Sequence, residues 1–350
     1  MIRSKSTIAT PPGATIKEQL VDRGMSQKEF ASRMEMSEKH ISKLINGEVQ
    51  LTPDVAMRLE MVLGVPAHFW SNLESIYREK IAKVQAENDM AEDLEILKSI
   101  PYNEMAKNHW VEPTSKKEER VFNLRKFFEV VRLGILQDPL IPNIAYRRTG
   151  TGAKSDYTLI TWAQKAKLEA RNISTSSINI DKLKTLLPTI REMTSEDPAK
   201  FCPVLCEKLA DCGIALVFLP HIGGSFLHGA TFYDGSKIVV GMTVRGKDAD
   251  RFWFSLFHEF GHIVYGHIAN TNGTTAEDEK NADSFARNAL IPDEAFRQFV
   301  SEERFDKLSI LEFARLVGID AGIVVGRLQK ERYIPFSWHG DLKTKYELTA

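Results

Sequence analysis

Residues 252–268 constrain the fold more than any other stretch, because they are apolar almost all round and yet contain His258, Glu259 and His262 within one helical turn. The stretch reads FWFSLFHEFGHIVYGHI. A helix that is apolar on every side is buried. Polar side chains inside a buried helix need partners, since burying them unpaired is costly. The stretch therefore predicts a buried helix whose polar residues share a partner, and a bound metal ion would satisfy all three.

The three polar residues form an HExxH motif. His258 and His262 are separated by one helical turn, so they lie on the same face of a helix. Two imidazoles in this arrangement fit zinc with an open coordination position, where water is acidified and the neighbouring Glu259 takes its proton. The alternative is a histidine pair that only packs in the core. Gly261 predicts a close approach at this helix, either by substrate or by another element.

A second helix, predicted over Ala276–Leu290, offers a third metal ligand. Asp278 and Glu279 flank its apolar stripe, and Glu279 has the longer reach. The alternative for Glu279 is an ordinary carboxylate at a helix start. Asp283 lies one turn beyond Glu279, where it could orient a metal ligand.

HEFGH followed by EKNADSFARNALIP resembles the ImmA/IrrE family of zinc metallopeptidases. That family shows an HExxH helix and then a segment of the type Glu-x-x-Ala-x-x-Phe-Ala-x-x-x-Leu-x-Pro. The resemblance implies that His258, His262 and Glu279 are the metal ligands and that Glu259 is the catalytic base. The second acidic residue that is usual in the second motif is Asn281 here, which removes one charge near the site. Members of the family cleave a partner repressor with narrow specificity.

Several polar residues near the motif are weaker candidates for the site. Tyr265 could stabilise an oxyanion, and Arg287 is a similar candidate. The histidines His221 and His228 could line the cleft, although a surface or core role is commoner. A closed, structural zinc site would need a fourth protein ligand. The nearest candidates for that ligand are His267 and Asp278.

From Gly213 onward the hydrophobic period changes from helix to strand. Strands are predicted over Gly213–Leu219, Leu227–Tyr233 and Ser236–Val240, with Asp234-Gly235 as a hairpin signal. An extended peptide could add as a further strand to the edge of this sheet, beside the metal helix.

Helix start and stop signals divide residues 12–66 into short helices. Ser26 begins one of them, and Ser37 begins the next, Glu38–Ile45, which Asn46-Gly47 ends. A short helix, a tight turn and a second short helix form the helix-turn-helix pattern. The second helix of this pattern would enter the major groove of DNA. Residues 1–11 are predicted to be a loose tail.

The second helix of this pattern has a polar outer face, which consists of Ser37, Glu38, Lys39, Ser42 and Lys43. Lys39 or Lys43 could reach a guanine edge or a phosphate. Ser42 could also reach a base edge or a phosphate. Gln27, at the start of the preceding helix, is placed for a phosphate. The alternative is a helical bundle for protein contacts, since residues 1–80 carry eleven basic and ten acidic side chains and so have a weak electrostatic footprint.

Roughly residues 11–80 resemble the HigA-type antitoxins, which are XRE-class helix-turn-helix proteins. The matching features are the Pro-Gly start, Ser-Gln, Asn-Gly, and Phe69-Trp70 followed by Asn72-Leu73 and Tyr77. The resemblance implies a homodimer bound to operator DNA with an inverted repeat. It also implies a cognate toxin as a partner.

Composition bears on the compartment. The formal net charge is -1, so the overall charge of the chain gives no indication that it binds nucleic acid or a membrane surface. No apolar run has the length of a membrane span, and the N-terminus has no signal-peptide pattern. We therefore expect a cytoplasmic protein. The three cysteines, Cys202, Cys206 and Cys212, are expected to be reduced and buried.

The sequence thus predicts a mainly α chain with a small sheet. The predicted domains are an all-α helix-turn-helix domain over 1–80, a helical connector over 81–208, an α+β zinc-peptidase-like domain over 209–300 and a helical extension over 301–350. The predicted function is that of a DNA-binding regulator or antitoxin fused to a zinc-dependent endopeptidase that cleaves a partner, such as a repressor or toxin. The alternative is a non-catalytic HigA-type antitoxin and autorepressor in which the zinc site is structural or a sensor.

Overall fold

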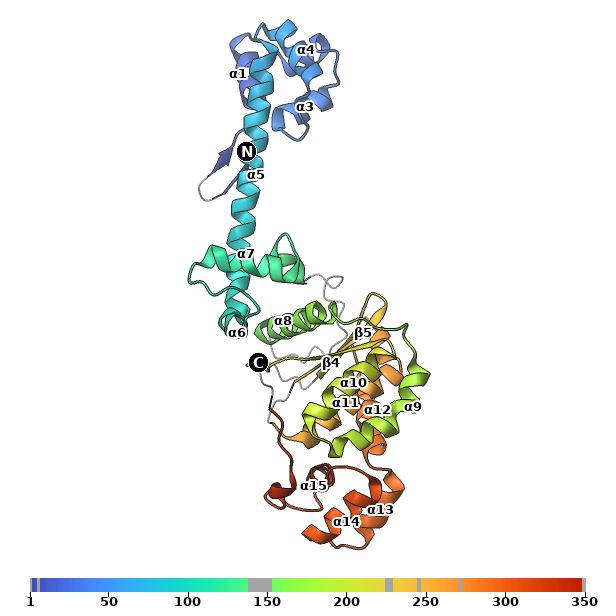
Figure 1. Ribbon diagram of the computed structural model, residues 1–350. Coiled ribbons are helices and arrows are strands. Elements are labelled where there is room, and N and C mark those ends of the chain that lie inside the picture. Colours follow the sequence, from blue (N-terminus) through green and yellow to red (C-terminus); the bar gives the residue numbers. More distant parts are fainter. Residues whose placement is uncertain are drawn as a thin grey trace. The chain divides into compact units, whose positions relative to one another are not determined.

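The structure is a computed structural model of the 350-residue chain. It describes residues 2–4, 7–137, 153–223, 229–243, 247–270 and 273–347. The chain divides into two compact units, Met1–Glu95 and Ile96–Ala350 (Figure 1). Each unit has its own hydrophobic core. Among the described residues, no helix has the length and apolar character needed to cross a membrane.

The N-terminal unit is built from helices whose ends follow the capping residues in the sequence. Ser26, Ser37 and Thr52 each begin a helix by accepting a hydrogen bond from the backbone N–H three residues on. Gly47 and Gly64 end two helices in the left-handed conformation that favours glycine, at φ +75° and +68°. The helices are α1 (Gly13–Asp22), α2 (Gln27–Arg33), α3 (Glu38–Asn46), α4 (Pro53–Leu63) and α5 (Ala67–Ile96). The predicted all-α helix-turn-helix fold is confirmed.

The start of the chain differs from the predicted loose tail. The strands β1 (Ile2–Arg3) and β2 (Ile8–Ala9) pair antiparallel. The hydroxyls of Ser4 and Thr7 donate hydrogen bonds to the carboxylate of Glu87 on α5. Contacts with a helix more than seventy residues away are invisible to local sequence patterns, which is why this hairpin was not predicted.

A three-stranded sheet lies at the centre of the C-terminal unit, in the order β3-β5-β4. Strand β3 (Ile214–Phe218) runs parallel to β5 (Lys237–Met242), and β4 (Gly229–Asp234) pairs antiparallel with β5 at the edge. Asp234 pairs with Lys237, so the turn residues are Gly235 and Ser236. The predicted turn at Asp234-Gly235 is therefore displaced by one residue.

Helices cover both faces of this sheet, because side chains alternate along each strand. On one face, Val217 and Val239 pack with Trp162 of α8 (Ala153–Ala170). On the other face, Leu216 and Val240 belong to the core around α11 (Ala249–Val264). Figure 1 shows α8 and α11 on opposite sides of the strands.

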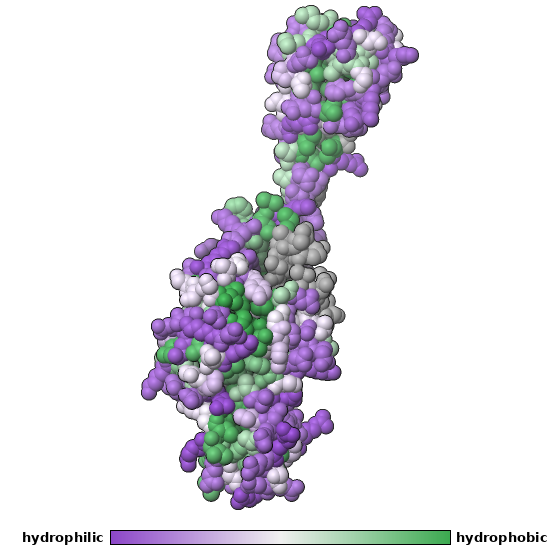
Figure 2. All heavy atoms as spheres, turned by 90° about the vertical axis from the view of Figure 1, so that its right-hand side faces the viewer, coloured by the Kyte–Doolittle hydropathy of each residue, from purple (hydrophilic) through white to green (hydrophobic). Residues whose placement is uncertain are grey.

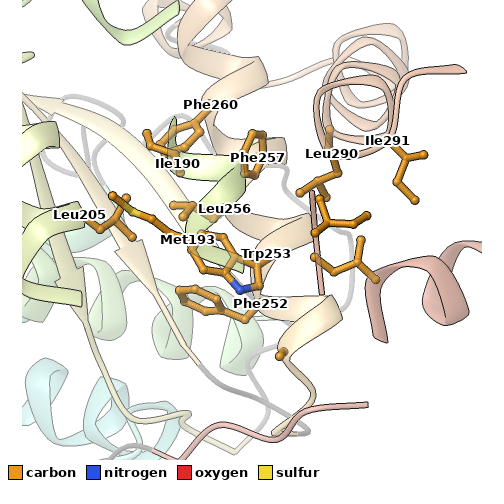
Figure 3. Packing of buried hydrophobic residues seen from close by; sticks show 14 of the residues in the cluster. Ile190, Met193, Leu205, Phe252, Trp253, Leu256, Phe257, Phe260, Leu290 and Ile291 are labelled. Atoms are coloured by element: carbon orange, nitrogen blue, oxygen red, sulfur yellow. The ribbon is translucent and has the colours of Figure 1, made fainter. Parts of the chain in front are cut away.

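Helix α11 is the central element of the larger core, as its apolar sequence predicts. Its residues Phe252, Trp253, Leu256, Phe257 and Phe260 are buried (Figure 3). Around them pack α9 (Ile180–Glu192), α10 (Pro198–Ala210) and α12 (Ala276–Leu290). Helices α8 and α9 and most of α10 fall within the predicted connector, and they share cores with the sheet and α11. The predicted domain boundaries remain predictions.

The remaining helices of this unit lie before α8 and after α12. They are α6 (Tyr102–Lys107), α7 (Lys117–Phe128), α13 (Asp293–Ser301), α14 (Lys307–Val317) and α15 (Ala321–Lys330). Residues 343–346 contact the start of α11. The Trp253 indole N–H donates to the buried Tyr346 hydroxyl over 2.9 Å, and Lys343 pairs with Asp250 at 2.9 Å.

Candidate metal centre and DNA-reading face

The candidate metal centre lies where α11 crosses α12. A Cβ atom on Gly261 would come within 2.9 Å of the Cα atom of Ala282, so this crossing needs glycine. Of the two uses predicted for Gly261, close approach by another helix is the one observed. The crossing brings polar side chains of both helices to one place.

Three of these side chains converge. The Nε2 atoms of His258 and His262 are 3.0 Å apart. The Glu279 carboxylate lies 3.4 Å from the first of these nitrogens and 3.7 Å from the second. One donor atom from each residue lies within 4.8 Å of the others. Two imidazoles and one carboxylate are a common zinc-binding set, so the residues present fit this ion.

The outward nitrogen of each histidine has its own partner. Nδ1 of His258 is 2.8 Å from Oδ1 of Asp283, the residue expected to orient a ligand. Nδ1 of His262 is 3.0 Å from Nδ1 of His267. A proton held on Nδ1 leaves the Nε2 lone pair free for a metal, and hydrogen bonds of this kind orient metal-binding histidines.

Electrostatics favour a positive charge between the two rings. Burial lowers the pKa of His258, but hydrogen bonds to Asp283 and Glu279 raise it to about 10. Burial and the neighbouring His258 lower the pKa of His262. The hydrogen bond from His258 holds the pKa of Glu279 down at about 2. The centre thus stabilises one proton between two rings, where the same atoms would stabilise a cation.

Glu259 is buried between α11 and the edge strand β4. The Thr231 hydroxyl donates a hydrogen bond to Glu259 Oε2 over 2.5 Å. A Cβ atom on Gly229 would lie 3.0 Å from both Cγ and Oε1 of Glu259, so glycine leaves room for the carboxylate. Burial raises the pKa of Glu259. Sequence reasoning missed Thr231, because its contact with Glu259 depends on the order of the strands in the sheet.

A second missed hydroxyl supports the third candidate ligand. Thr274 donates a hydrogen bond to Glu279 Oε1 over 2.5 Å. Thr275, the next residue, forms a capping box with Asp278 at the start of α12. The run of two threonines before the acidic residues was the local signal for both contacts.

The two candidates for a closing fourth ligand have other partners. His267 meets His262 through Nδ1, on the ring edge away from the converging Nε2 atoms. Its Nε2 atom lies 3.3 Å from Oδ1 of Asp278. The other oxygen of Asp278 accepts the N–H of Thr275 over 2.8 Å. Within the described part of the chain, the ligand group consists of His258, His262 and Glu279.

The weaker candidates take other places. Tyr265 is exposed and stacks on His267, with ring centroids 5.5 Å apart. Arg287 is exposed and donates a hydrogen bond to Ser284. His221 is partly buried in the segment after β3. His228 lies outside the described residues. These positions give no support to the predicted catalytic roles.

Helix α3 presents the predicted outer face. Ile41 and Leu44 are buried, whereas the predicted contact residues Gln27, Ser37, Lys39, Ser42 and Lys43 are exposed. The Ser37 hydroxyl caps α3 by accepting the N–H of His40. On the side seen in Figure 2, hydrophilic residues cover most of the N-terminal unit. The contacts of these residues with DNA remain predictions.

Comparison with known proteins finds a family match within each unit. Residues 16–70 match the helix-turn-helix family model, and residues 239–329 match the IrrE N-terminal-like domain. The uncharacterized HTH-type transcriptional regulator YddM of Escherichia coli (strain K12) is 36% identical over 66 residues, which cover 19% of this chain and 70% of that protein. A solved addiction module antidote protein of the HigA family from Coxiella burnetii is 26% identical. That match covers 25% of this chain and 94% of the other, with a TM-score of 0.22.

Proposed function

We propose a zinc-dependent peptidase site in the C-terminal unit of this chain, which belongs to the HTH-type transcriptional regulators and carries an IrrE N-terminal-like domain. The proposed reaction is hydrolysis of a peptide bond in a partner protein. The proposed metal ligands are His258, His262 and Glu279. Glu259 is the proposed general base.

The observation that carries this proposal is a set of three donors, without a fourth protein ligand among the described residues, beside a buried carboxylate. Structural zinc sites are closed by four protein ligands, whereas catalytic sites keep one position for water or substrate. His267 and Asp278, the candidates for a closing ligand, are held by other partners. This arrangement favours the peptidase over the non-catalytic alternative.

The protein's own residues would bind the ion, orient one another and move the proton. When bound, zinc supplies Lewis-acid chemistry that acidifies water and polarises a carbonyl group. Glu259 would accept a proton from the attacking water and return it to the leaving amine. The hydrogen bond from Thr231 holds the Glu259 carboxylate in place for this transfer. Asp283 would hold the ring of His258 in the same way.

The edge strand β4 suggests the class of substrate. Its described backbone pairs with β5 on one side, and its residue Thr231 contacts the proposed base. An extended peptide that added to the other side of β4 would therefore run close to Glu259. We propose that the substrate is an extended segment of a partner protein, such as a repressor or a toxin.

Metal removal and restoration test the proposed function. The purified chain is expected to hold about one zinc ion, as a single three-ligand site requires. Cleavage would be measured as new protein N-termini in a lysate of the source cells. We expect those termini with the zinc-loaded chain, their loss after chelation and their return with added zinc. Stoichiometric zinc without any metal-dependent cleavage would instead support the non-catalytic alternative.

We further propose that the N-terminal unit binds operator DNA as a homodimer at an inverted repeat, with a cognate toxin as a partner. The helix-turn-helix family match supports the DNA-binding part. The exposed basic residues Lys39 and Lys43 lie on the helix that would enter the major groove. The inverted repeat matches the two-fold symmetry of a dimer.

Replacing these two lysines should weaken operator binding strongly. A base-reading contact is worth at least about 1 kcal/mol, so the Lys39→Ala, Lys43→Ala chain should bind its upstream DNA at least about 30-fold more weakly. Lys80 and Lys83 are exposed on α5, and their double alanine variant removes the same charge elsewhere. Gel-shift titrations at one salt concentration would compare the three chains. Equal losses in both variants would mean that only net charge matters and that α3 reads no bases.

A further inference from the structure

We propose that His267 is a positioning residue for the metal centre. It would accept the Nδ1 proton of His262, hold that ring in its metal-binding orientation and link it to the start of α12. The inference rests on the proposed zinc site. It assigns to His267 a role in which its own side chain does not bind the metal.

The contact between the two rings is short and protected from water. Nδ1 of His262 lies 3.0 Å from Nδ1 of His267, and the ring centroids are 5.2 Å apart. The exposed fraction of the side chain is 8% for His262 and 10% for His267. A buried polar atom without a partner is costly, so the two nitrogens must share a proton.

The direction of this hydrogen bond follows from where the metal would bind. The Nε2 atom of His262 faces His258 and Glu279, so its lone pair is the one available to a metal. A neutral imidazole with a free Nε2 lone pair carries its proton on Nδ1. His262 is therefore the donor and His267 the acceptor. A neutral His267 that accepts at Nδ1 must carry its own proton on Nε2.

Asp278 lies close to Nε2 of His267, the nitrogen that carries this second proton. Its Oδ1 atom lies 3.3 Å from Nε2 of His267. Its Oδ2 atom accepts a hydrogen bond from the Thr275 backbone N–H, and its own backbone N–H donates one to the Thr275 hydroxyl. The carboxylate is thus fixed by the capping box of α12 and can hold His267 in the accepting tautomer.

The ring of His267 is also restrained from the side. Tyr265 stacks on it at 5.5 Å between centroids, with an angle of 27° between the ring planes. The turn that carries His267 begins at Gly266, whose φ of +74° suits glycine. The turn after Gly266 and the stacking with Tyr265 therefore hold the His267 ring beside Nδ1 of His262. To become a fourth ligand, His267 would have to leave these contacts.

Zinc affinity of the full chain tests this role without any substrate. The apo chain would be titrated with zinc against a colour-forming chelator. Loss of a hydrogen-bond partner of a metal ligand typically costs about 10–100-fold in metal affinity, so we expect that loss in His267→Ala. His267→Asn should recover most of the affinity, because its amide oxygen can accept the hydrogen bond that the Nδ1–H of His262 donates. Tyr265→Phe keeps the stacked ring and should match the parent.

The absorption spectrum of the cobalt-loaded chain separates a positioning role from direct ligation. We expect the same cobalt bands and about one ion per chain in the parent and in His267→Ala, since the same three donors bind the ion. Parent-like zinc affinity in His267→Ala would overturn the inference alone. Changed cobalt bands in that variant, or no recovery in a folded His267→Asn chain, would also overturn it. A parent chain that binds no zinc would overturn the proposed function, and the inference with it.

Discussion

The Glu259→Gln chain is expected to hold about one zinc ion, like the parent, and to cleave its substrate at least about 100-fold more slowly. Glutamine has nearly the same shape, and its amide oxygen can still accept the hydrogen bond that Thr231 donates. It cannot accept a proton from water at neutral pH. The variant therefore separates proton transfer from metal binding and from folding.

A matched variant on the neighbouring helix controls for the lost negative charge. Glu277 is exposed on α12, and its carboxylate lies 3.7 Å from the equally exposed Lys280. Glu277→Gln should cleave at the parent rate. Cleavage would be followed as the rate at which new protein N-termini appear, with zinc content measured on the same samples. Parent-like cleavage by Glu259→Gln would exclude Glu259 as the base, and loss of zinc would make it part of the metal-binding set.

The fold of the N-terminal unit was readable because its signals are local. Ser26, Ser37 and Thr52 each cap a helix through an N–H only three residues away. Gly47 and Gly64 end helices through their own backbone conformation. Such signals act within a few residues, so one sequence contains all the information needed to place the helix ends.

The donor set of the candidate metal centre was readable for a related reason. His258 and His262 are fixed on one face by helical spacing alone. Glu279 of the next helix was singled out by its reach, and a family resemblance supported this choice, because periodicity alone does not say which helices cross. The crossing itself rests on Gly261 against Ala282, a contact between two chain segments.

Asp283, which contacts His258, was predicted to orient a metal ligand, but the contacts of Thr231 and His267 could not be read from sequence. Thr231 reaches Glu259 only because β4 is the edge strand beside α11, a consequence of strand order. His267 was expected, if anything, to close a structural site. Its true contact depends on which ring edge of His262 faces the turn. The hydrogen bond that Trp253 donates to Tyr346 likewise joins residues that are 93 positions apart, so local sequence patterns do not reveal it.

The His262→Ala chain is expected to lose stoichiometric zinc. His262 supplies one of the three proposed protein donors, and its Nε2 atom lies 3.0 Å from Nε2 of His258 and 3.7 Å from the Glu279 carboxylate. Removing a direct ligand should cost more than the roughly 10–100-fold typical of a residue that only orients one. Zinc affinity should therefore fall further in His262→Ala than in His267→Ala. Competition with a chelator would measure the zinc affinity of both variants and show which substitution lowers it more.

A histidine outside the centre controls for the substitution itself. His68 is exposed on α5, and His68→Ala should keep about one zinc ion per chain. Circular dichroism would establish that the His262→Ala chain is folded, so that lost zinc reports on the site and not on unfolding. Unchanged zinc in a folded His262→Ala chain would contradict the assignment. The ion would then have to bind elsewhere, and Cys202 and Cys206, which are half-buried one turn apart on α10, would be the first residues to replace.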